Sequence, residues 1–273
     1  MDTTAGSPAR DHRIGRIDFT VMPLAAAIDY VLEASDAVAT GTLGHPGLAI
    51  HFCNAYNVAL AKGDSTYASL LAQADVVFSD GVPITWVGRR AYPLVADAWE
   101  RVYGPDVMRG VLDRSTDGGP RHYLLGGTPE TLDLLQSQIA QRHPDALVVG
   151  AESPPFRPAT PAELAQRDER LRACGATIVW VGLGTPRQDA EVRRLADALP
   201  ITAMAVGAAF DFLAGTKPQA PQWMQRSGLE WAFRLASEPG RLGRRYVWGN
   251  SVFAAEAART LRDARRGRPA SAG

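Results

Sequence analysis

Short apolar runs alternate along the chain with longer segments in which apolar residues recur at helical spacing. Six runs are apolar at most positions, as strands buried on both faces of a parallel sheet require; they cover residues 47–53, 75–79, 121–126, 146–150, 176–182 and 201–207. Between them, residues 128–142 carry Leu132, Leu135 and Ile139 at helical spacing behind a Thr-Pro-Glu helix start, and residues 161–173 and 186–198 have similar patterns. This alternation predicts an α/β fold with an open, mostly parallel, Rossmann-like sheet and helices on both faces.

The stretch ADVVFSDGVPITW, residues 74–86, is compatible with two structures. An Asp-Gly pair between apolar runs is typical of a tight β-hairpin. However, the segment after Gly81, with Pro83 near its start and Trp86 following, resembles a helix more than a strand. We therefore expect Asp80 at the carboxyl end of a parallel strand, the edge where ligands bind in open α/β sheets.

The pattern changes near residues 216–221, after which no strand is predicted. The segment from Arg226 to Arg268 contains ten Arg and four acidic residues, a net charge of +6 within a chain whose formal net charge is zero. Its apolar residues recur near helical spacing, which predicts a basic, moderately amphipathic helical appendage. We expect a disordered N-terminus over 1–13, an α/β domain over 14–216, the appendage over 217–266 and a disordered tail over 267–273.

Composition excludes several classes of protein. The apolar fraction, 46%, is ordinary for a globular protein, and the balanced overall charge provides no field that would attract nucleic acid. Cys53 and Cys174 have no metal or redox spacing and are expected to be small buried residues in a reducing compartment. The N-terminus lacks the apolar segment of a signal peptide, and no apolar run reaches about 18 residues, so neither export nor a membrane span is predicted.

Candidate chemistry gathers at the predicted strand ends. The turns at 126–130 (GGTPE) and 182–188 (GLGTPRQ) place glycine between a strand and a helix start, where backbone N–H groups can approach a phosphate. Neither matches the dinucleotide fingerprint G-x-G-x-x-G, and either turn is also explained by structure alone. Asp80 is either the cap of the following helix or a general base for an attacking hydroxyl. No His, Asp or Glu spacing indicates a metal site, so no metal is expected.

Four ordered stretches carry a resemblance to a known family. They are NAYNVALAKGDSTYASLLAQADVVFSDGVPITWVGRR (54–90), RVYGPDVM (101–108), VGLGTPRQD (181–189) and GAAFDFLAGTKPQAPQWMQRSGLEWAFRLASEPGRLGRRYVWGN (207–250). Together they resemble the WecG/TagA/CpsF glycosyltransferases, glycosyltransferase family 26, over nearly the whole ordered chain.

The resemblance implies an inverting, metal-independent sugar transfer that needs no cofactor. The donor would be a UDP-sugar carrying an N-acetylmannosamine-type sugar, glucose or glucuronic acid, and the acceptor a polyprenyl-diphosphate-linked sugar. The products would be cell-envelope polymers or exopolysaccharides, teichoic-acid linkers among them. The implied location is the cytoplasm, peripherally on the inner face of the plasma membrane, where the appendage would dock. Relatives also suggest a homo-oligomer, and no nucleic-acid partner is expected.

The family's signatures imply roles for individual residues. Asp80 would be the catalytic base, with Asn54, Arg101 and Gln188 as further catalytic residues. Substrate-binding residues would lie in the turns and the appendage: Gly81, Gly126, Gly127, Gly182, Gly184, Pro186, Asp211, Arg234, Arg241, Arg244 and Arg245. Such a transfer needs one base for the acceptor hydroxyl and cationic or N–H groups for the departing UDP, which these residues could supply. One departure is Phe52, at a position where relatives often carry Thr.

Two other functions remain open. The glycine turns are compatible with a nucleotide-dependent oxidoreductase, although the full fingerprint is missing. The Arg-rich end is compatible with a non-catalytic anion-binding protein, although the overall charge is near neutral. Binding of UDP rather than NAD(P)H would favour the glycosyltransferase.

Overall fold

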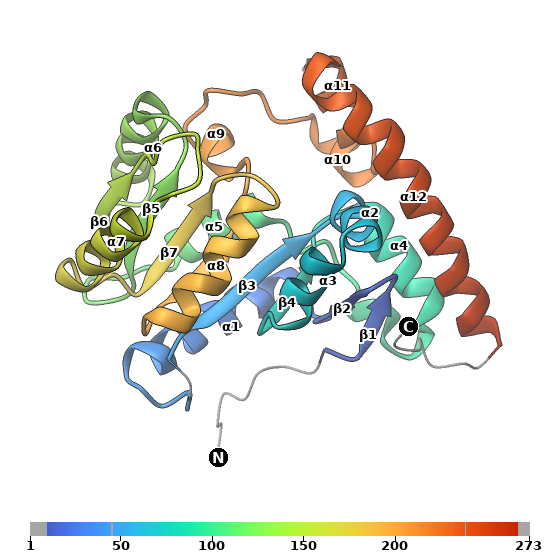
Figure 1. Cartoon of the computed structure of the whole chain (residues 1–273), viewed down its shortest axis with the longest axis horizontal. Coiled ribbons are helices and arrows are strands. Elements are labelled where there is room, and N and C mark those ends of the chain that lie inside the picture. The colour runs from blue at the N-terminus through green and yellow to red at the C-terminus, as the bar shows by residue number, and fades with distance from the viewer. Residues whose placement is uncertain (1–9, 45, 238, 267–273) are drawn as a thin grey trace. The chain divides into compact units, whose positions relative to one another are not determined.

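A computed structural model describes residues 10–44, 46–237 and 239–266. Six strands form one parallel sheet with helices around it, in the order β4-β3-β8-β7-β5-β6 (Figure 1). The strands are β3 (Leu48–Cys53), β4 (Val76–Ser79), β5 (Arg121–Gly126), β6 (Leu147–Glu152), β7 (Ile178–Gly182) and β8 (Thr202–Ala205). Each overlaps one of the six predicted apolar runs, with β6 extending two residues past its run, so the predicted α/β, Rossmann-like fold is confirmed.

Most of the helices lie in the crossovers between these strands, whereas the first precedes β3 and the last four follow β8. They are α1 (Leu24–Ala39), α2 (Ala55–Gly63), α3 (Ser65–Ala72), α4 (Val82–Ala91), the 3₁₀ helix η1 (Pro93–Ala98), α5 (Gly104–Asp113), α6 (Pro129–Arg142), α7 (Pro161–Ala173), α8 (Arg187–Ala198), α9 (Ala209–Leu213), α10 (Gln222–Arg226), α11 (Glu230–Ser237) and α12 (Pro239–Arg265). Local signals explain the starts of α6 and α7. Each has a Thr side chain at its N-cap and Pro in its first turn, and Glu163 completes a capping box at α7.

A short antiparallel hairpin was missed from the sequence. Strands β1 (His12–Ile14) and β2 (Ile17–Phe19) pair Ile14 with Ile17 around a turn in which Gly15 has φ +62°. Strand β1 begins inside the segment expected to be disordered, because Ile14, Ile17 and Phe19 are buried in a core. Residues 1–9 and 267–273, also expected to be disordered, lie outside the described residues.

Contacts divide the chain into two compact units, each with its own core. Among the described residues, the first unit comprises 25–51 without 45, and 104–218; its core is built on β5, β7, β8, α7 and α8. The second unit comprises 10–24, 52–103 and 219–266 without 238. Its core joins the hairpin, α2, α3 and α4 to Phe253 and Ala257 of α12. The domain boundary expected at 216–217 stays a prediction.

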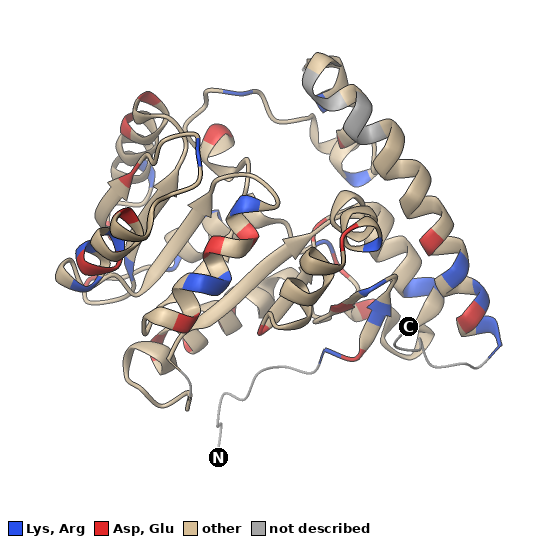
Figure 2. Ribbon diagram, viewed as in Figure 1, with Lys and Arg blue, Asp and Glu red and all other residues tan. Residues whose placement is uncertain are grey.

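The described part of the C-terminal segment contains helices α10, α11 and α12 and no strand, as predicted. Helix α12 packs against α2, α4 and β1 of its own unit. Figure 2 shows basic residues over its last turns, with Arg262 and Arg265 in the final turn. None of the described helices combines the length and the apolarity that a membrane crossing requires.

Candidate functional site

Strand β4 ends at Ser79, and α4 begins three residues later, so the hairpin interpretation of Asp80-Gly81 is excluded. The backbone is held on both sides at this point. Asp80 N donates to Cys53 O (2.9 Å), and Val102 N donates to Ser79 O (2.9 Å). Gly81 occupies the N-cap with φ +155° and ψ 140°, a conformation that is essentially restricted to glycine. The N-cap position of α4 is thus Gly81 and not Asp80, and it makes no side-chain cap hydrogen bond.

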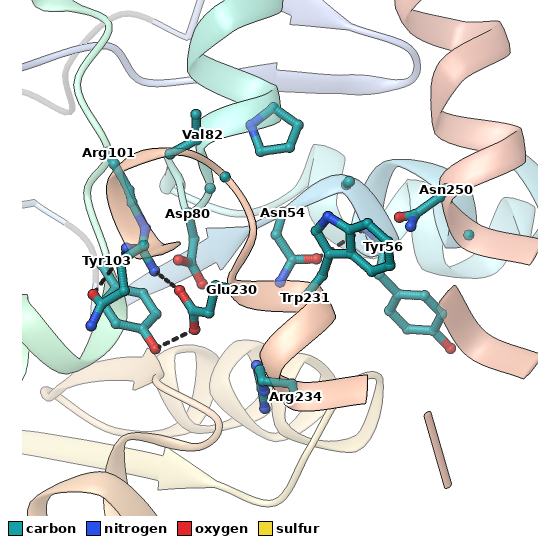
Figure 3. Close-up of a pocket in the computed structure, with 16 residues that line it drawn as sticks. Asn54, Tyr56, Asp80, Val82, Arg101, Tyr103, Glu230, Trp231, Arg234 and Asn250 are labelled. Carbon is teal, nitrogen blue, oxygen red and sulfur yellow. Dashed lines mark hydrogen bonds and ion pairs between the residues drawn. The ribbon is translucent and has the colours of Figure 1, made fainter. Parts of the chain in front are cut away.

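Asp80 lines a cleft that lies entirely within the second unit (Figure 3). The cleft is open at its mouth, and it encloses about 840 Å³ when the solvent there is counted. Its walls come from the residues after β3, the start of α4, the segment before α5, and α10 to α12. The lining residues are Asn54, Ala55, Tyr56, Asp80, Gly81, Val82, Pro83, Arg101, Tyr103, Gln225, Gly228, Glu230, Trp231, Arg234, Gly249 and Asn250.

Asn54 has a structural task that fixes its orientation in the cleft. It is the N-cap of α2, and its Oδ1 accepts from Tyr56 N (3.0 Å). Asn57 completes a capping box by accepting from Asn54 N (3.0 Å), and its own amide donates to the hydroxyl of Tyr67 (2.7 Å). Because Oδ1 is used by the cap, the amide nitrogen is the group that Asn54 can offer to a ligand as a hydrogen-bond donor.

Arg101 is the centre of a second polar group in the cleft (Figure 3). Its guanidinium lies over the ring of Tyr103, with 3.8 Å between Cζ and the ring centroid. It forms an ion pair with Glu230 and donates to Gln225 Oε1 (3.3 Å). The Tyr103 hydroxyl donates to the other Glu230 oxygen (2.9 Å). Burial, followed by the nearby carboxylates of Glu230 and Asp80, raises the pKa of Tyr103 well above its ordinary value, so its hydroxyl stays protonated.

Arg234 on α11 is the appendage arginine that lines the described cleft. Two glycines let the appendage approach closely. A Cβ at Gly228 would lie 3.3 Å from Val82 Cβ, and a Cβ at Gly249 would lie 3.2 Å from Tyr56 Cδ2. Of the other candidate arginines, Arg241, Arg244 and Arg245 lie on α12, but their side chains are outside the described part of the structure.

The remaining candidate residues belong to the first unit, at the carboxyl ends of its strands. Gly126 and Gly182 end β5 and β7 and lie so close that a Cβ at Gly126 would be 2.5 Å from Gly182 O. Gly127, Gly184 and Pro186 continue the same two turns, and Asp211 on α9 forms an ion pair with Lys217 (3.0 Å). The glycines therefore have clear backbone reasons to be glycine, and their role as phosphate ligands stays a prediction.

Gln188 holds the turn between β7 and α8 together. Its Oε1 accepts from Gly184 N (3.0 Å), and its Nε2 donates to Ala205 O (3.3 Å). The side chain is only 5% exposed. Both ends of the amide are thus used inside the first unit, and the catalytic role expected for Gln188 stays a prediction.

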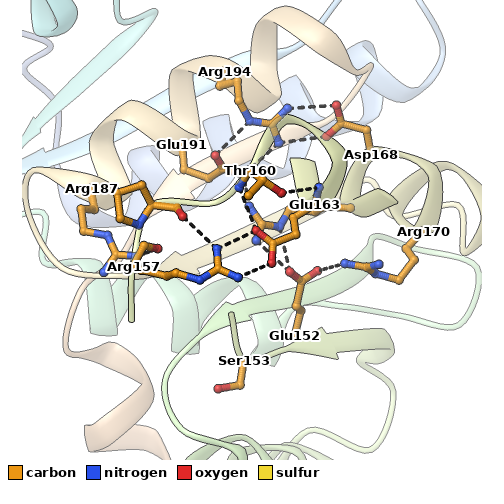
Figure 4. Close-up of polar contacts among 12 residues, drawn as sticks. Glu152, Ser153, Arg157, Thr160, Glu163, Asp168, Arg170, Arg187, Glu191 and Arg194 are labelled. Atoms are coloured by element: carbon orange, nitrogen blue, oxygen red, sulfur yellow. Dashed lines mark hydrogen bonds and ion pairs between the residues drawn. The ribbon is translucent and has the colours of Figure 1, made fainter. Parts of the chain in front are cut away.

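A network of ion pairs connects β6, α7 and α8 in the first unit (Figure 4). Arg167, buried at 3% exposure, binds Glu152 and Glu191, while Arg194 binds Glu191 and Asp168. Although burial opposes ionisation of Glu152, hydrogen bonds from its arginine partners hold its pKa below the ordinary value. The charges of the network are paired with one another, so it connects the three elements by ion pairs. Glu152, Arg167 and Arg170 also line a second, smaller pocket of the first unit.

Sequence reasoning missed Tyr103, Gln225 and Glu230 as residues of the cleft. Tyr103 lies inside the second quoted stretch, and Glu230 is one of only four acids in the basic segment 226–268, a signal that could have drawn attention to it. Phe52 packs in the core, 5% exposed, with 5.7 Å between its ring centroid and that of Phe78. A threonine hydroxyl at that position is thus replaced by aromatic packing.

The fold and the cleft together define a parallel α/β enzyme whose acidic, basic and amide groups meet beyond the strand ends. The model of the glycosyl transferase WecG/TagA/CpsF family matches residues 12–267, and the chain belongs to this family. It is therefore a glycosyltransferase of cell-envelope polysaccharide synthesis. Among the described residues, no group of three His, Cys, Asp or Glu side chains is arranged to hold a metal ion. The expected independence of metal stays a prediction.

Proposed function

We propose that the protein transfers a sugar, with inversion, from a UDP-sugar to a polyprenyl-diphosphate-linked acceptor, without a metal and with Asp80 as the general base. The observation that carries the proposal is that Asp80, Asn54, Arg101 and Arg234 line one cleft. Four residues from distant parts of the sequence, all expected from the family's signatures, thus line the same cleft.

The transfer requires a balanced exchange at the anomeric carbon. The Asp80 carboxylate takes the proton of the acceptor hydroxyl as that oxygen attacks C1 of the donor sugar. The bond between C1 and the diphosphate oxygen breaks, its electron pair leaves with UDP, and the configuration at C1 inverts. Asp80 is suited to this task because the backbone hydrogen bond to Cys53 holds it at the strand end.

The departing diphosphate needs positive charge or N–H donors. Arg234 is the cleft cation carried by the appendage, and the amide nitrogen of Asn54 is a further donor. The glycine turns at 126–127 and 182–184, with Pro186, Gln188 and Asp211, are proposed to contribute from the first unit. Arg241, Arg244 and Arg245 are proposed as additional contacts to diphosphate.

We propose that the acceptor's lipid keeps the enzyme on the inner face of the plasma membrane, with the appendage as the docking surface. Supporting this, large apolar side chains of the appendage are exposed, including Trp223 on α10 and Val247 and Trp248 on α12. Basic residues on the same helix would add about 1 kcal/mol each near an anionic leaflet.

Replacement of Asp80 by Asn tests the base. Transfer from a UDP-sugar to a lipid-linked acceptor should fall by roughly 10²–10⁴-fold, the usual contribution of a general base, while UDP affinity changes by less than about twofold. Asp97→Asn is the matched control, because Asp97 is an exposed carboxylate in the same unit that does not line the cleft. Retained turnover in Asp80→Asn would exclude Asp80 as the base.

The donor is identified by thermal unfolding with a panel of UDP-sugars, because a ligand that binds the folded state raises the melting temperature according to its affinity. Stabilisation by UDP-N-acetylmannosamine, UDP-glucose or UDP-glucuronic acid would name the donor. Stabilisation by NAD(P)H without any UDP-sugar would instead favour an oxidoreductase.

A further inference from the structure

We infer that Arg101 is a positioning residue: with Tyr103 it clamps Glu230, and so holds helix α11 where Arg234 and Trp231 face the cleft. This inference rests on the proposed function for its ligand, UDP. It assigns Glu230 and Tyr103 a role in the reaction, and it moves Arg101 from contact with the substrate to support of the appendage.

The clamp consists of three contacts of the Arg101 guanidinium and a fourth contact between Tyr103 and Glu230. One terminal nitrogen of Arg101 pairs with Glu230 and the other donates to Gln225, while the flat face of the group lies on the Tyr103 ring. Tyr103 closes the arrangement by donating to the second oxygen of Glu230 (2.9 Å). Both Glu230 oxygens are thus bound, and each terminal nitrogen of Arg101 binds a side chain of the appendage.

The side chains of the clamp are partly buried, which strengthens the contacts between them. The side chains of Arg101 and Glu230 are 18% and 14% exposed, so water screens the pair far less than it screens a surface ion pair. Burial and nearby carboxylates raise the pKa of Tyr103, which favours the protonated hydroxyl that donates to Glu230.

The turn before α11 is also held by close packing and a hydrogen bond. Gly228 has φ +75°, and a Cβ there would come within 3.3 Å of Val82 at the start of α4. Gln225 is itself fixed, because its Nε2 donates to Ala220 O (2.7 Å). The start of α11 is therefore held at two adjacent points, Glu230 in the clamp and Gly228 in the turn. The second point lies against Val82, the residue after Asp80-Gly81.

Fixing Glu230 also fixes the next turn of the helix. Residues four apart lie on the same face of an α-helix, so Arg234 is on the face of α11 that carries Glu230. Both residues line the cleft, as does Trp231 (Figure 3). A loose α11 would carry the guanidinium of Arg234 away from the position where a diphosphate develops charge, and an error of about 1 Å in such a position can slow a reaction about 100-fold.

The alternative is that Arg101 binds the diphosphate directly, with Glu230 as a competitor for the same guanidinium. The two arrangements predict different changes in UDP affinity for the variant Glu230→Gln. If Arg101 is a ligand, removal of the competing carboxylate leaves UDP affinity unchanged or raises it. If Arg101 is a clamp, the same change frees α11 and weakens UDP binding.

The experiment measures two quantities on the full chain: UDP affinity by calorimetry, and amide hydrogen exchange in the peptide that contains α11. In Glu230→Gln, UDP should bind about tenfold more weakly and the α11 amides should exchange about tenfold faster. Tyr103→Phe should shift both quantities in the same direction by a smaller factor, and serves if Glu230→Gln does not fold. Asp18→Asn is the control, because it breaks a comparable ion pair with Arg13 in the same unit, away from the cleft, and should change neither quantity.

Unchanged α11 exchange in Glu230→Gln would overturn the clamp. Unchanged or tighter UDP binding in that variant would overturn the positioning role and favour direct contact by Arg101. If the wild-type protein does not bind UDP, the proposed donor class fails, while the exchange of α11 still decides whether the clamp exists.

Discussion

We predict that protonation of His122 destabilises the first unit at acidic pH, because the hydrogen bonds of its buried ring require the neutral form. The ring is fully buried on β5. Ser115 donates its hydroxyl hydrogen to Val111 O (2.9 Å), so its Oγ must accept from His122 Nε2 at 2.9 Å. The indole of Trp180 donates to His122 Nδ1 (3.2 Å). The neutral imidazole is therefore fully satisfied, and a second proton would face the indole N–H.

The pKa of His122 sets how much folding stability is lost on acidification. Burial lowers the pKa of His122 from 6.5 to about 4, so the unfolded chain binds this proton first as the pH falls. The stability contributed by the neutral ring is complete above pH 6.5, declines through the interval down to pH 4 and is absent below it. The full shift corresponds to about 3 kcal/mol, of which about 2 kcal/mol is lost between pH 7.5 and pH 5.

Urea unfolding at pH 7.5 and pH 5 compares the wild-type protein with His122→Gln, whose amide can keep both hydrogen bonds but does not titrate. The variant is less stable at neutral pH, yet its free energy of unfolding should fall by about 2 kcal/mol less on acidification. Equal acid-induced losses in the wild type and in His122→Gln would refute the reasoning.

Two further predictions concern packing and the membrane. Gly126→Ala should lower the free energy of unfolding by about 3 kcal/mol, because its Cβ would overlap Gly182 O. The control is Gly41→Ala, where φ is +71° and nothing lies within 4 Å of the added Cβ, and it should lower the free energy of unfolding by only about 1 kcal/mol. Equal losses of the two variants in denaturation would contradict the steric argument. Val247→Glu should reduce co-sedimentation with anionic vesicles several-fold, whereas Phe156→Glu, which changes an even more exposed apolar residue in the first unit, should not. Equal binding by both variants would remove α12 from the docking surface.

Much of the fold could be predicted because its strands are buried on both faces. An apolar run such as β4 has one stable environment, the interior of a parallel sheet, so its position in the sequence defines its structure. The β1–β2 hairpin was missed for the opposite reason. Its strands have three residues each, and its only signal is Gly15 with Arg16 between two isoleucines, next to a Pro- and Gly-rich terminus that suggested disorder.

The site could be predicted only in part. Asp80 and Asn54 lie at strand ends, where sequence pattern and topology together indicate ligand contact. The pairing of Arg101 with Glu230 has no such basis, because the partners are 129 residues apart and lie outside any strand. A side-chain contact of this range leaves no periodic trace in the sequence, so only the three-dimensional structure reveals it.

The order in which the cleft's walls are synthesised gives the enzyme a built-in delay. Tyr103 and Glu230 are 127 residues apart, so at ordinary rates of translation roughly 6 to 25 seconds pass between the appearance of the two. During that interval Asp80 exists without the α10–α12 wall that lines its cleft. A ribosome-bound or prematurely terminated chain thus carries Asp80, the proposed base, without the finished pocket. Under the proposed mechanism, sugar transfer would begin only when the last helices have been made.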